Sequence, residues 1–121
     1  MIERICWTIL ALIHAMPALA AFRPALISRL YGVDPGADVF TLLHHRAALF
    51  VAVVVICVWA ALRPKVRQLA SVAVGISIVS FVLIWWLSGM SPALRTIAVV
   101  DLIGLPILCY VAWQAFRGAA V

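Results

Sequence analysis

The sequence predicts an all-α integral membrane protein, a bundle of four transmembrane helices with a short interfacial helix between spans one and two. Of the 121 residues, 68% are apolar and only 11% are charged, whereas soluble domains are about half apolar and a quarter charged. The apolar residues form four blocks, each close to the roughly 20 residues that a helix needs to cross a bilayer. Single strands would leave backbone groups unpaired in lipid, so the valine-rich blocks are also predicted to be helices.

A single domain, residues 1–121, is predicted to contain all four spans. They cover about residues 4–22, 40–62, 66–88 and 93–116. The first block ends in Pro17-Ala18-Leu19-Ala20, which is similar to the cleavage site of a secretion signal. Because His14 interrupts its apolar stretch, we expect this segment to remain as a helix of the bundle.

The longest connection joins the first two spans and contains the predicted interfacial helix. Pro24 suits the first turn of this helix, and Gly32 suits its C-terminal end. Its apolar side chains are predicted to face the lipid; they are Leu26, Ile27 and Leu30.

Basic residues in the connections predict the orientation. One side of the membrane receives Arg4, Arg63, Lys65, Arg67 and Arg117, and the other receives Arg23, Arg29 and Arg95. Cytoplasmic loops carry an excess of Lys and Arg, so both termini are predicted to lie in the cytoplasm. The net charge of +5 indicates anionic lipid headgroups as partners. It does not indicate nucleic acid, which would require a basic stripe on a polar domain.

Tryptophans mark both predicted interfaces. Trp7, Trp59 and Trp113 fall near the cytoplasmic interface, and Trp85 and Trp86 fall near the opposite one. This distribution is typical of the aromatic belt of a membrane protein.

Polar residues inside the spans are functional candidates, because titratable groups in lipid are costly. The predicted ligand or proton pocket consists of His14, His44, His45, Arg46, Ser77, Ser80 and Asp101. At a rise of about 1.5 Å per residue, the histidines, Ser80 and Asp101 lie at similar depth in the outer half of the bilayer. Small residues accompany these groups on each helix and mark where membrane helices approach one another. We therefore expect the polar groups to converge inside the bundle.

The second span carries polar residues on two different faces. His44 and His45 straddle a face that also holds Ala48 and Ala52, which predicts that this face points inward. Arg46 points about 200° away from His44, at about 100° per residue. Its side chain could reach the headgroups, or it could pair with Asp101 or with another subunit. Pairing is favoured, because the outer half offers Asp101 no other obvious counter-charge.

The sequence allows a metal ion or a haem as a cofactor. His14, His44 and His45 are candidate metal ligands, and two histidines from different helices could hold a haem iron. Adjacent histidines point about 100° apart, however, and no His-x-x-x-His spacing occurs. The three cysteines lack a Cys-x-x-Cys spacing and are more simply read as buried small residues.

The sequence contains no nucleophile triad, phosphate loop or paired-carboxylate motif, so binding or transport is favoured over catalysis. Three functions stay open. The first is the binding or transport of a small ligand or ion through the His/Asp pocket. The second is an accessory or assembly subunit whose polar network is structural, and the third is a redox subunit that contacts haem or quinone. A bundle this thin is expected to form a homo-oligomer or to join a larger membrane complex.

Two short segments, residues 42–50 and 101–106, resemble a family of small bacterial four-helix integral membrane proteins with a His-Arg motif near the start of the second helix. The resemblance covers most of the chain. It implies the four-helix membrane fold and a place in the inner membrane of a bacterium, as a multi-pass protein, and brings no established activity with it.

Overall fold

The structure, a computed structural model, describes residues 1–119 and is helical through most of them. Four of its helices are long and apolar enough to cross a membrane. The elements in order are α1 (Ile2–Leu19), α2 (Ala25–Tyr31), α3 (Asp38–Leu62), the 3-10 turn η1 (Pro64–Val66), α4 (Arg67–Leu87), the 3-10 turn η2 (Pro92–Leu94) and α5 (Arg95–Arg117). The four predicted spans are confirmed, with ends that differ by a few residues.

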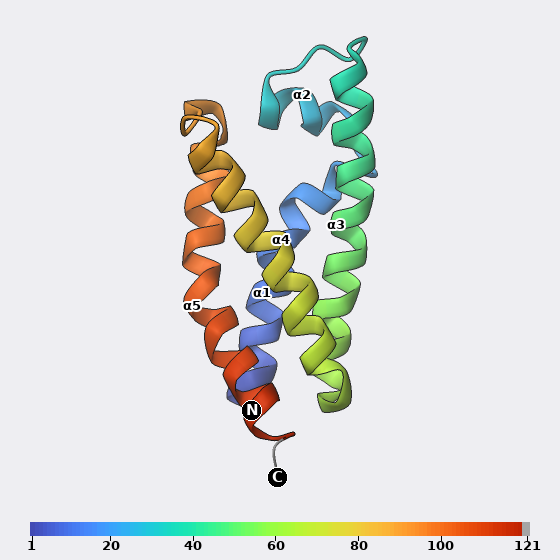
Figure 1. The fold of residues 1–121 in the computed structure, drawn as a ribbon. Coiled ribbons are helices and arrows are strands. Elements are labelled where there is room, and N and C mark those ends of the chain that lie inside the picture. The colour runs from blue at the N-terminus through green and yellow to red at the C-terminus, as the bar shows by residue number, and fades with distance from the viewer. Residues whose placement is uncertain (120–121) are drawn as a thin grey trace.

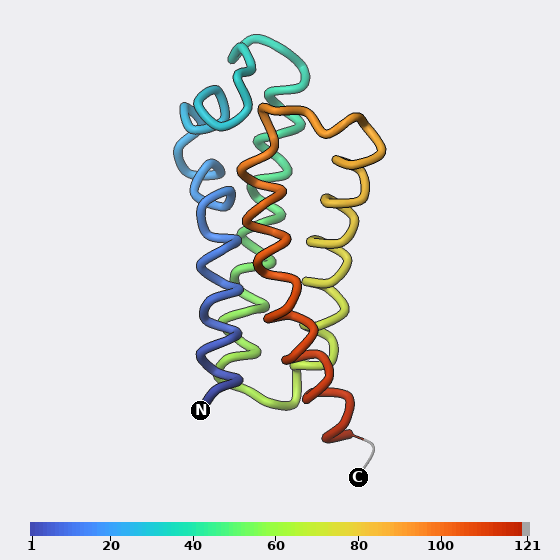
Figure 2. The backbone as a smooth tube through the Cα atoms, turned by 90° about the vertical axis from the view of Figure 1, so that its left-hand side faces the viewer, coloured from blue at the N-terminus to red at the C-terminus, as the bar shows by residue number. Residues whose placement is uncertain are grey.

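The spans form a bundle with both termini at one end, here called the terminal end, and α2 at the other, the α2 end (Figure 1, Figure 2). α1 packs along α3, and α4 packs along α5. α1 also contacts α5, whereas α3 and α4 meet over a shorter stretch. Because α4 leans across the bundle from the lower part of α3 toward α5, the gap between α3 and α4 widens toward the α2 end (Figure 1).

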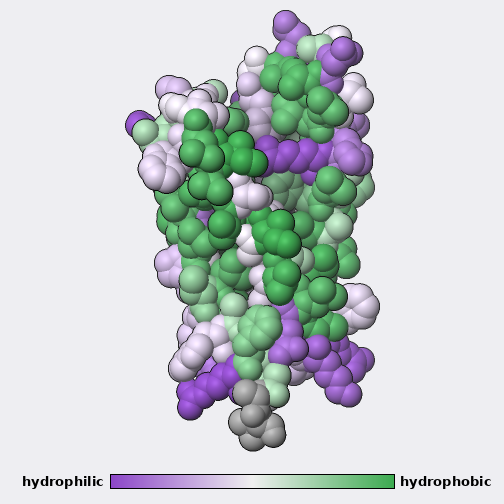
Figure 3. All heavy atoms as spheres, viewed as in Figure 1, coloured by the Kyte–Doolittle hydropathy of each residue, from purple (hydrophilic) through white to green (hydrophobic). Residues whose placement is uncertain are grey.

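The surface of the bundle is apolar between two polar ends. Figure 3 shows hydrophobic side chains over the middle of one face and hydrophilic ones gathered at its ends. Leu42, Leu69 and Ile76 are 68%, 73% and 66% exposed. Soluble proteins rarely expose apolar surface on this scale, so the chain is a multi-pass membrane protein and these side chains face lipid.

The interior is filled by small side chains and a few large ones, and Trp7 is among them. Trp7 is fully buried beside Leu10 in the main hydrophobic cluster. Trp7 therefore packs inside the bundle and does not face outward with the predicted belt, because the face of α1 that carries it packs against the other helices. Trp59, Trp86 and Trp113 are each more than half exposed and suit the predicted belt.

The short helix α2 is confirmed in position, but its apolar face is not turned to lipid as predicted. Ile27 is fully buried in a small cluster with Ala20 and Ala47. α2 therefore covers the ends of α1 and α3. Gly32 ends the helix in the left-handed conformation, with φ 65°, and its N–H donates to the Ser28 carbonyl at 2.9 Å, which matches the predicted glycine stop.

Gly104 permits the close approach of α5 to its neighbours. A Cβ atom at this position would lie 3.3 Å from Ile13 Cδ1 of α1 and 3.5 Å from Ile78 Cδ1 of α4. At Gly75 of α4, a Cβ atom would meet only Leu108, at an ordinary 3.8 Å. Small residues thus set the helix spacing here, as is typical of membrane bundles.

Gly104→Val is expected to lower the free energy of unfolding by about 1–3 kcal/mol, because its extra carbons overpack a filled site. Gly75→Val is the matched control and should cost less, since its surroundings are looser. Unfolding by dodecyl sulfate in detergent micelles, followed by circular dichroism, measures both. Equal losses for the two variants would contradict this reading of Gly104.

Candidate functional site

Two cavities with charged side chains in their walls lie at the α2 end, where the helices separate. The α1–α5 cavity has a volume of about 490 Å³ and is lined by α1, α2, α5, one residue of η2 and one residue of α3. The α3–α4 groove has a volume of about 410 Å³ and is lined by α3, α4 and Leu94 of η2. Phe50 of α3 lines both, so a single aromatic ring forms part of both walls.

His14 is the most buried polar residue of the α1–α5 cavity, at 2% exposed. Its Nδ1 lies 2.8 Å from the Leu10 carbonyl oxygen. A carbonyl accepts hydrogen bonds, so Nδ1 carries the proton and donates it. In a neutral ring this leaves Nε2 as an acceptor, and Nε2 is buried without a partner among the described residues. The ring centroid lies 5.8 Å from that of Phe50.

Asp101 of α5 lines the same cavity and is 9% exposed. The structure thus places His14 and Asp101 in the lining of one cavity, which agrees with the expectation that these two side chains converge inside the bundle. Asp101 forms no salt bridge within residues 1–119. Arg29 of α2 also lines this cavity, so one of the basic residues predicted to lie on this side of the membrane takes part in it.

Arg46 belongs to the other cavity. Its guanidinium carbon lies 5.1 Å from the centroid of Phe50 and 4.8 Å from that of Phe81 on α4. Arg46 forms no ion pair in the described part of the chain, so the predicted pairing with Asp101 is wrong, whereas pairing with another subunit stays a prediction. The side chain instead spans from α3 to α4, where aromatic rings hold the cation.

Tyr31, at the end of α2, is half-buried and lines neither cavity. Burial raises the pKa of Tyr31, while the positive charge of Arg46 lowers it and the negative charge of Asp101 raises it.

Ser77 and Ser80 of α4 line the α3–α4 groove with Arg46. Ser77 is half-buried and Ser80 is exposed. The predicted pocket is therefore divided: His14 and Asp101 lie in one cavity, whereas Arg46, Ser77 and Ser80 lie in the other.

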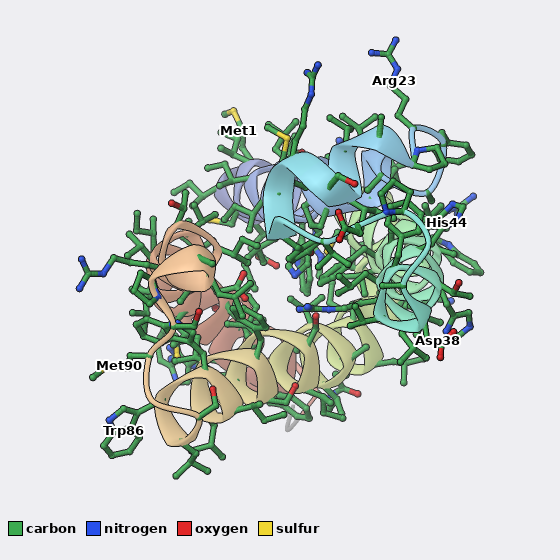
Figure 4. The ribbon with its side chains drawn as sticks, turned by 90° about the horizontal axis from the view of Figure 1, so that it is seen from above. Met1, Arg23, Asp38, His44, Trp86 and Met90 are labelled. Atoms are coloured by element: carbon green, nitrogen blue, oxygen red, sulfur yellow. The ribbon has the colours of Figure 1, made fainter. Side chains whose placement is uncertain are left out.

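His44 and His45 line neither cavity. The Nε2 atom of His44 lies 3.0 Å from the carbonyl oxygen of Ala21, so this ring ties α3 to the chain between α1 and α2, where Figure 4 labels it. His45 is exposed, as are Ala48 and Ala52 on the same face. The predicted inward face of α3 is thus wrong.

A second stripe of small residues explains this error. Ala47, Cys57 and Ala61 lie on the buried side of α3, at spacings that also fit one helical face. α3 therefore has two faces with small residues, and the face without histidines packs against the other helices. Rotating α3 to that face also turns Arg46 and Phe50 toward α4 and α1.

The structure does not gather the candidate metal ligands. Within residues 1–119, no three His, Cys, Asp or Glu side chains come close enough to hold a metal ion. His14 is buried in α1, His44 is bound to a backbone carbonyl, and His45 is exposed. The predicted metal site therefore has no assembled set of three ligands in the described residues.

The terminal end holds a polar contact that the sequence reading missed. Arg67, the first residue of α4, is buried; its Nη1 donates to Glu3 of α1, and its Nε donates to the Ala60 carbonyl of α3 at 3.0 Å. Lys65 and Gln68 line a cavity of about 410 Å³ beside it. The sequence does offer a sign of this contact, because Glu3 is the only acidic residue on that side of the predicted bundle.

Comparisons of the chain with protein families, with curated proteins and with solved structures give no match. The fold and cavities define the class: a small multi-pass membrane protein with two cavities at the end opposite its termini.

Proposed function

We propose that this protein binds a small, lipid-soluble ligand in the α1–α5 cavity, in the inner membrane of a bacterium, with both termini in the cytoplasm. The cavity then lies in the outer half of the membrane. The excess of basic residues at the terminal end supports this orientation.

The observation that carries the proposal is the unpaired Nε2 of His14. Buried polar groups in proteins nearly always have a hydrogen-bond partner, and leaving one unpaired costs about 1–3 kcal/mol. A purely structural network would be expected to satisfy it. An acceptor without a partner, on a residue that lines a cavity, is instead suited to a ligand that brings a donor.

The cavity also indicates the chemistry of the ligand. Its lining is largely apolar, with His14, Asp101 and Arg29 as the charged or titratable groups. Ligand sites typically combine apolar walls with a few placed polar groups that fix orientation. The expected ligand is an apolar molecule with a hydroxyl or N–H group that can donate to His14.

Filling the cavity should remove the ligand. Val100 lines the cavity on α5, and Val99, its neighbour, faces elsewhere and is 45% exposed. Val100→Phe is expected to lower ligand occupancy because the ring takes up cavity volume, whereas Val99→Phe should leave it unchanged. Native mass spectrometry of the purified protein, with analysis of its organic extract, measures the occupancy.

The same experiment includes a defined probe. Protein in neutral nanodiscs should take up 1-decanol, which carries one donor, in preference to decane, which carries none. Failure to retain any molecule, together with equal uptake of decanol and decane, would contradict the proposal. The native spectrum also tests the expected homo-oligomer, which a strictly monomeric spectrum would rule out.

A further inference from the structure

We propose that the α3–α4 groove is a second, separate binding site, in which Arg46 binds the carboxylate of a long-chain amphiphile. The inference does not depend on the ligand of the α1–α5 cavity. It rests on the surroundings of one cation within a membrane span.

Arg46 lies well inside α3. It follows the first residue of the helix, Asp38, by eight positions, or about 12 Å along the axis. A charged group at such depth is costly and normally has a partner. No ion pair involves Arg46 within residues 1–119, and none of their side-chain hydrogen bonds comes from it.

The two aromatic contacts determine which part of the guanidinium stays available. Phe50 and Phe81 lie within 5.1 Å of its central carbon, and together they stabilise the cation. Phenylalanine rings have no oxygen or nitrogen atom that could accept a hydrogen bond from the guanidinium. The five N–H donors of a guanidinium lie in its plane and form a fork that matches a carboxylate or phosphate in a bidentate manner.

The groove around Arg46 combines two serines with an apolar path. Ser77 and Ser80 line its α4 wall, where the Ser80 hydroxyl donates to the Ser77 carbonyl at 3.4 Å, and the remaining lining is apolar. Leu49 and Ile84 flank it and are 56% and 64% exposed, so the groove is open at the surface that faces lipid. In Figure 3 a hydrophilic stretch crosses the upper part of the otherwise hydrophobic face.

This combination selects an anion with an apolar tail. The tail can leave the groove sideways into the bilayer while the head meets Arg46. Asp101, the predicted partner of Arg46, lines the other cavity and forms no ion pair with the guanidinium. A carboxylate suits the site better than a lipid phosphate, because Phe81 lies six residues, or about 9 Å, inside the end of α4 and phosphates stay at the membrane surface.

Native mass spectrometry of the full chain in nonionic detergent, titrated with oleate, tests this assignment. We expect one oleate per chain and no comparable adduct with methyl oleate, which has the same tail without the charge. Arg46→Gln should weaken oleate binding by at least about 10-fold, because a charge-assisted hydrogen bond is lost. Arg95→Gln is the matched control: it removes an exposed arginine at the same end and should bind as the wild type does.

A second variant covers the case in which Arg46→Gln fails to fold. Ser77→Leu keeps Arg46 and fills the groove, so it should also lose oleate. Equal oleate binding by the wild type and a folded Arg46→Gln or Ser77→Leu variant would overturn the proposal. Tighter binding of phosphatidylglycerol than of oleate would overturn the carboxylate assignment, and equal binding of inorganic phosphate would overturn the need for a tail.

Discussion

Arg67→Met is expected to destabilise the bundle more than any other single change considered above. Arg67 joins three helices, through Glu3 of α1, the Ala60 carbonyl of α3 and its own place at the start of α4. Removing one partner of a buried ion pair costs about 3–5 kcal/mol. The Glu3 side chain is 34% exposed, so water takes over part of its solvation, and we expect a loss of about 2–4 kcal/mol.

Two controls separate the buried contact from simple loss of charge. Lys65→Met removes a neighbouring exposed cation and should change stability by no more than about 0.5 kcal/mol. Glu3→Gln combined with Arg67→Met removes both charges and should recover part of the loss, because no carboxylate is left unpaired. Dodecyl sulfate unfolding, followed by circular dichroism, compares the variants. A loss for Arg67→Met no larger than that for Lys65→Met would show that the contact is not stabilising.

His14→Leu is expected to have the largest effect on ligand binding. The substitution removes the unpaired Nε2 acceptor and the Nδ1–H donor to the Leu10 carbonyl, and it places an apolar side chain of similar bulk at a buried position. Ligand occupancy should fall by at least about 10-fold. Stability should change by no more than about 1 kcal/mol in either direction, because removing a buried acceptor without a partner offsets the loss of one hydrogen bond.

The contrast between the two effects makes this test informative. If His14 only fixes the packing of the bundle, its replacement would destabilise the protein. Any loss of ligand would then accompany that loss of stability. That result would favour the accessory-subunit interpretation. His14→Gln keeps an amide oxygen as acceptor and should retain part of the binding, whereas retention by His14→Leu at the level of the wild type would refute the role of Nε2. Native mass spectrometry and the unfolding midpoint are the two measurements.

The spans could be predicted from the sequence because lipid imposes a length and a composition that are visible residue by residue. The inward faces of α1 and α5 could also be predicted, since each helix has a single stripe of small residues beside its polar group. His14 with Ala11 and Ala18, and Asp101 with Gly104, are buried as those stripes require.

α3 could not be oriented in the same way. It carries two stripes of small residues, and which one faces inward depends on how α1 packs against it, which is a property of the whole bundle. The position of Arg46 follows from that rotation. The division of the polar residues into two cavities also depends on the tilt of α4 away from α3. No residue pattern in the sequence predicts that tilt.

The position of Phe50 has a consequence for regulation. Its ring borders both cavities, and close-packed interiors respond to displacement by shifting between discrete arrangements. A molecule that moves this ring from one side changes the room available on the other. Under the two binding proposals, the two occupancies are expected to be thermodynamically linked, and linkage is reciprocal: the factor by which one ligand alters the affinity for the second equals the factor in the reverse direction.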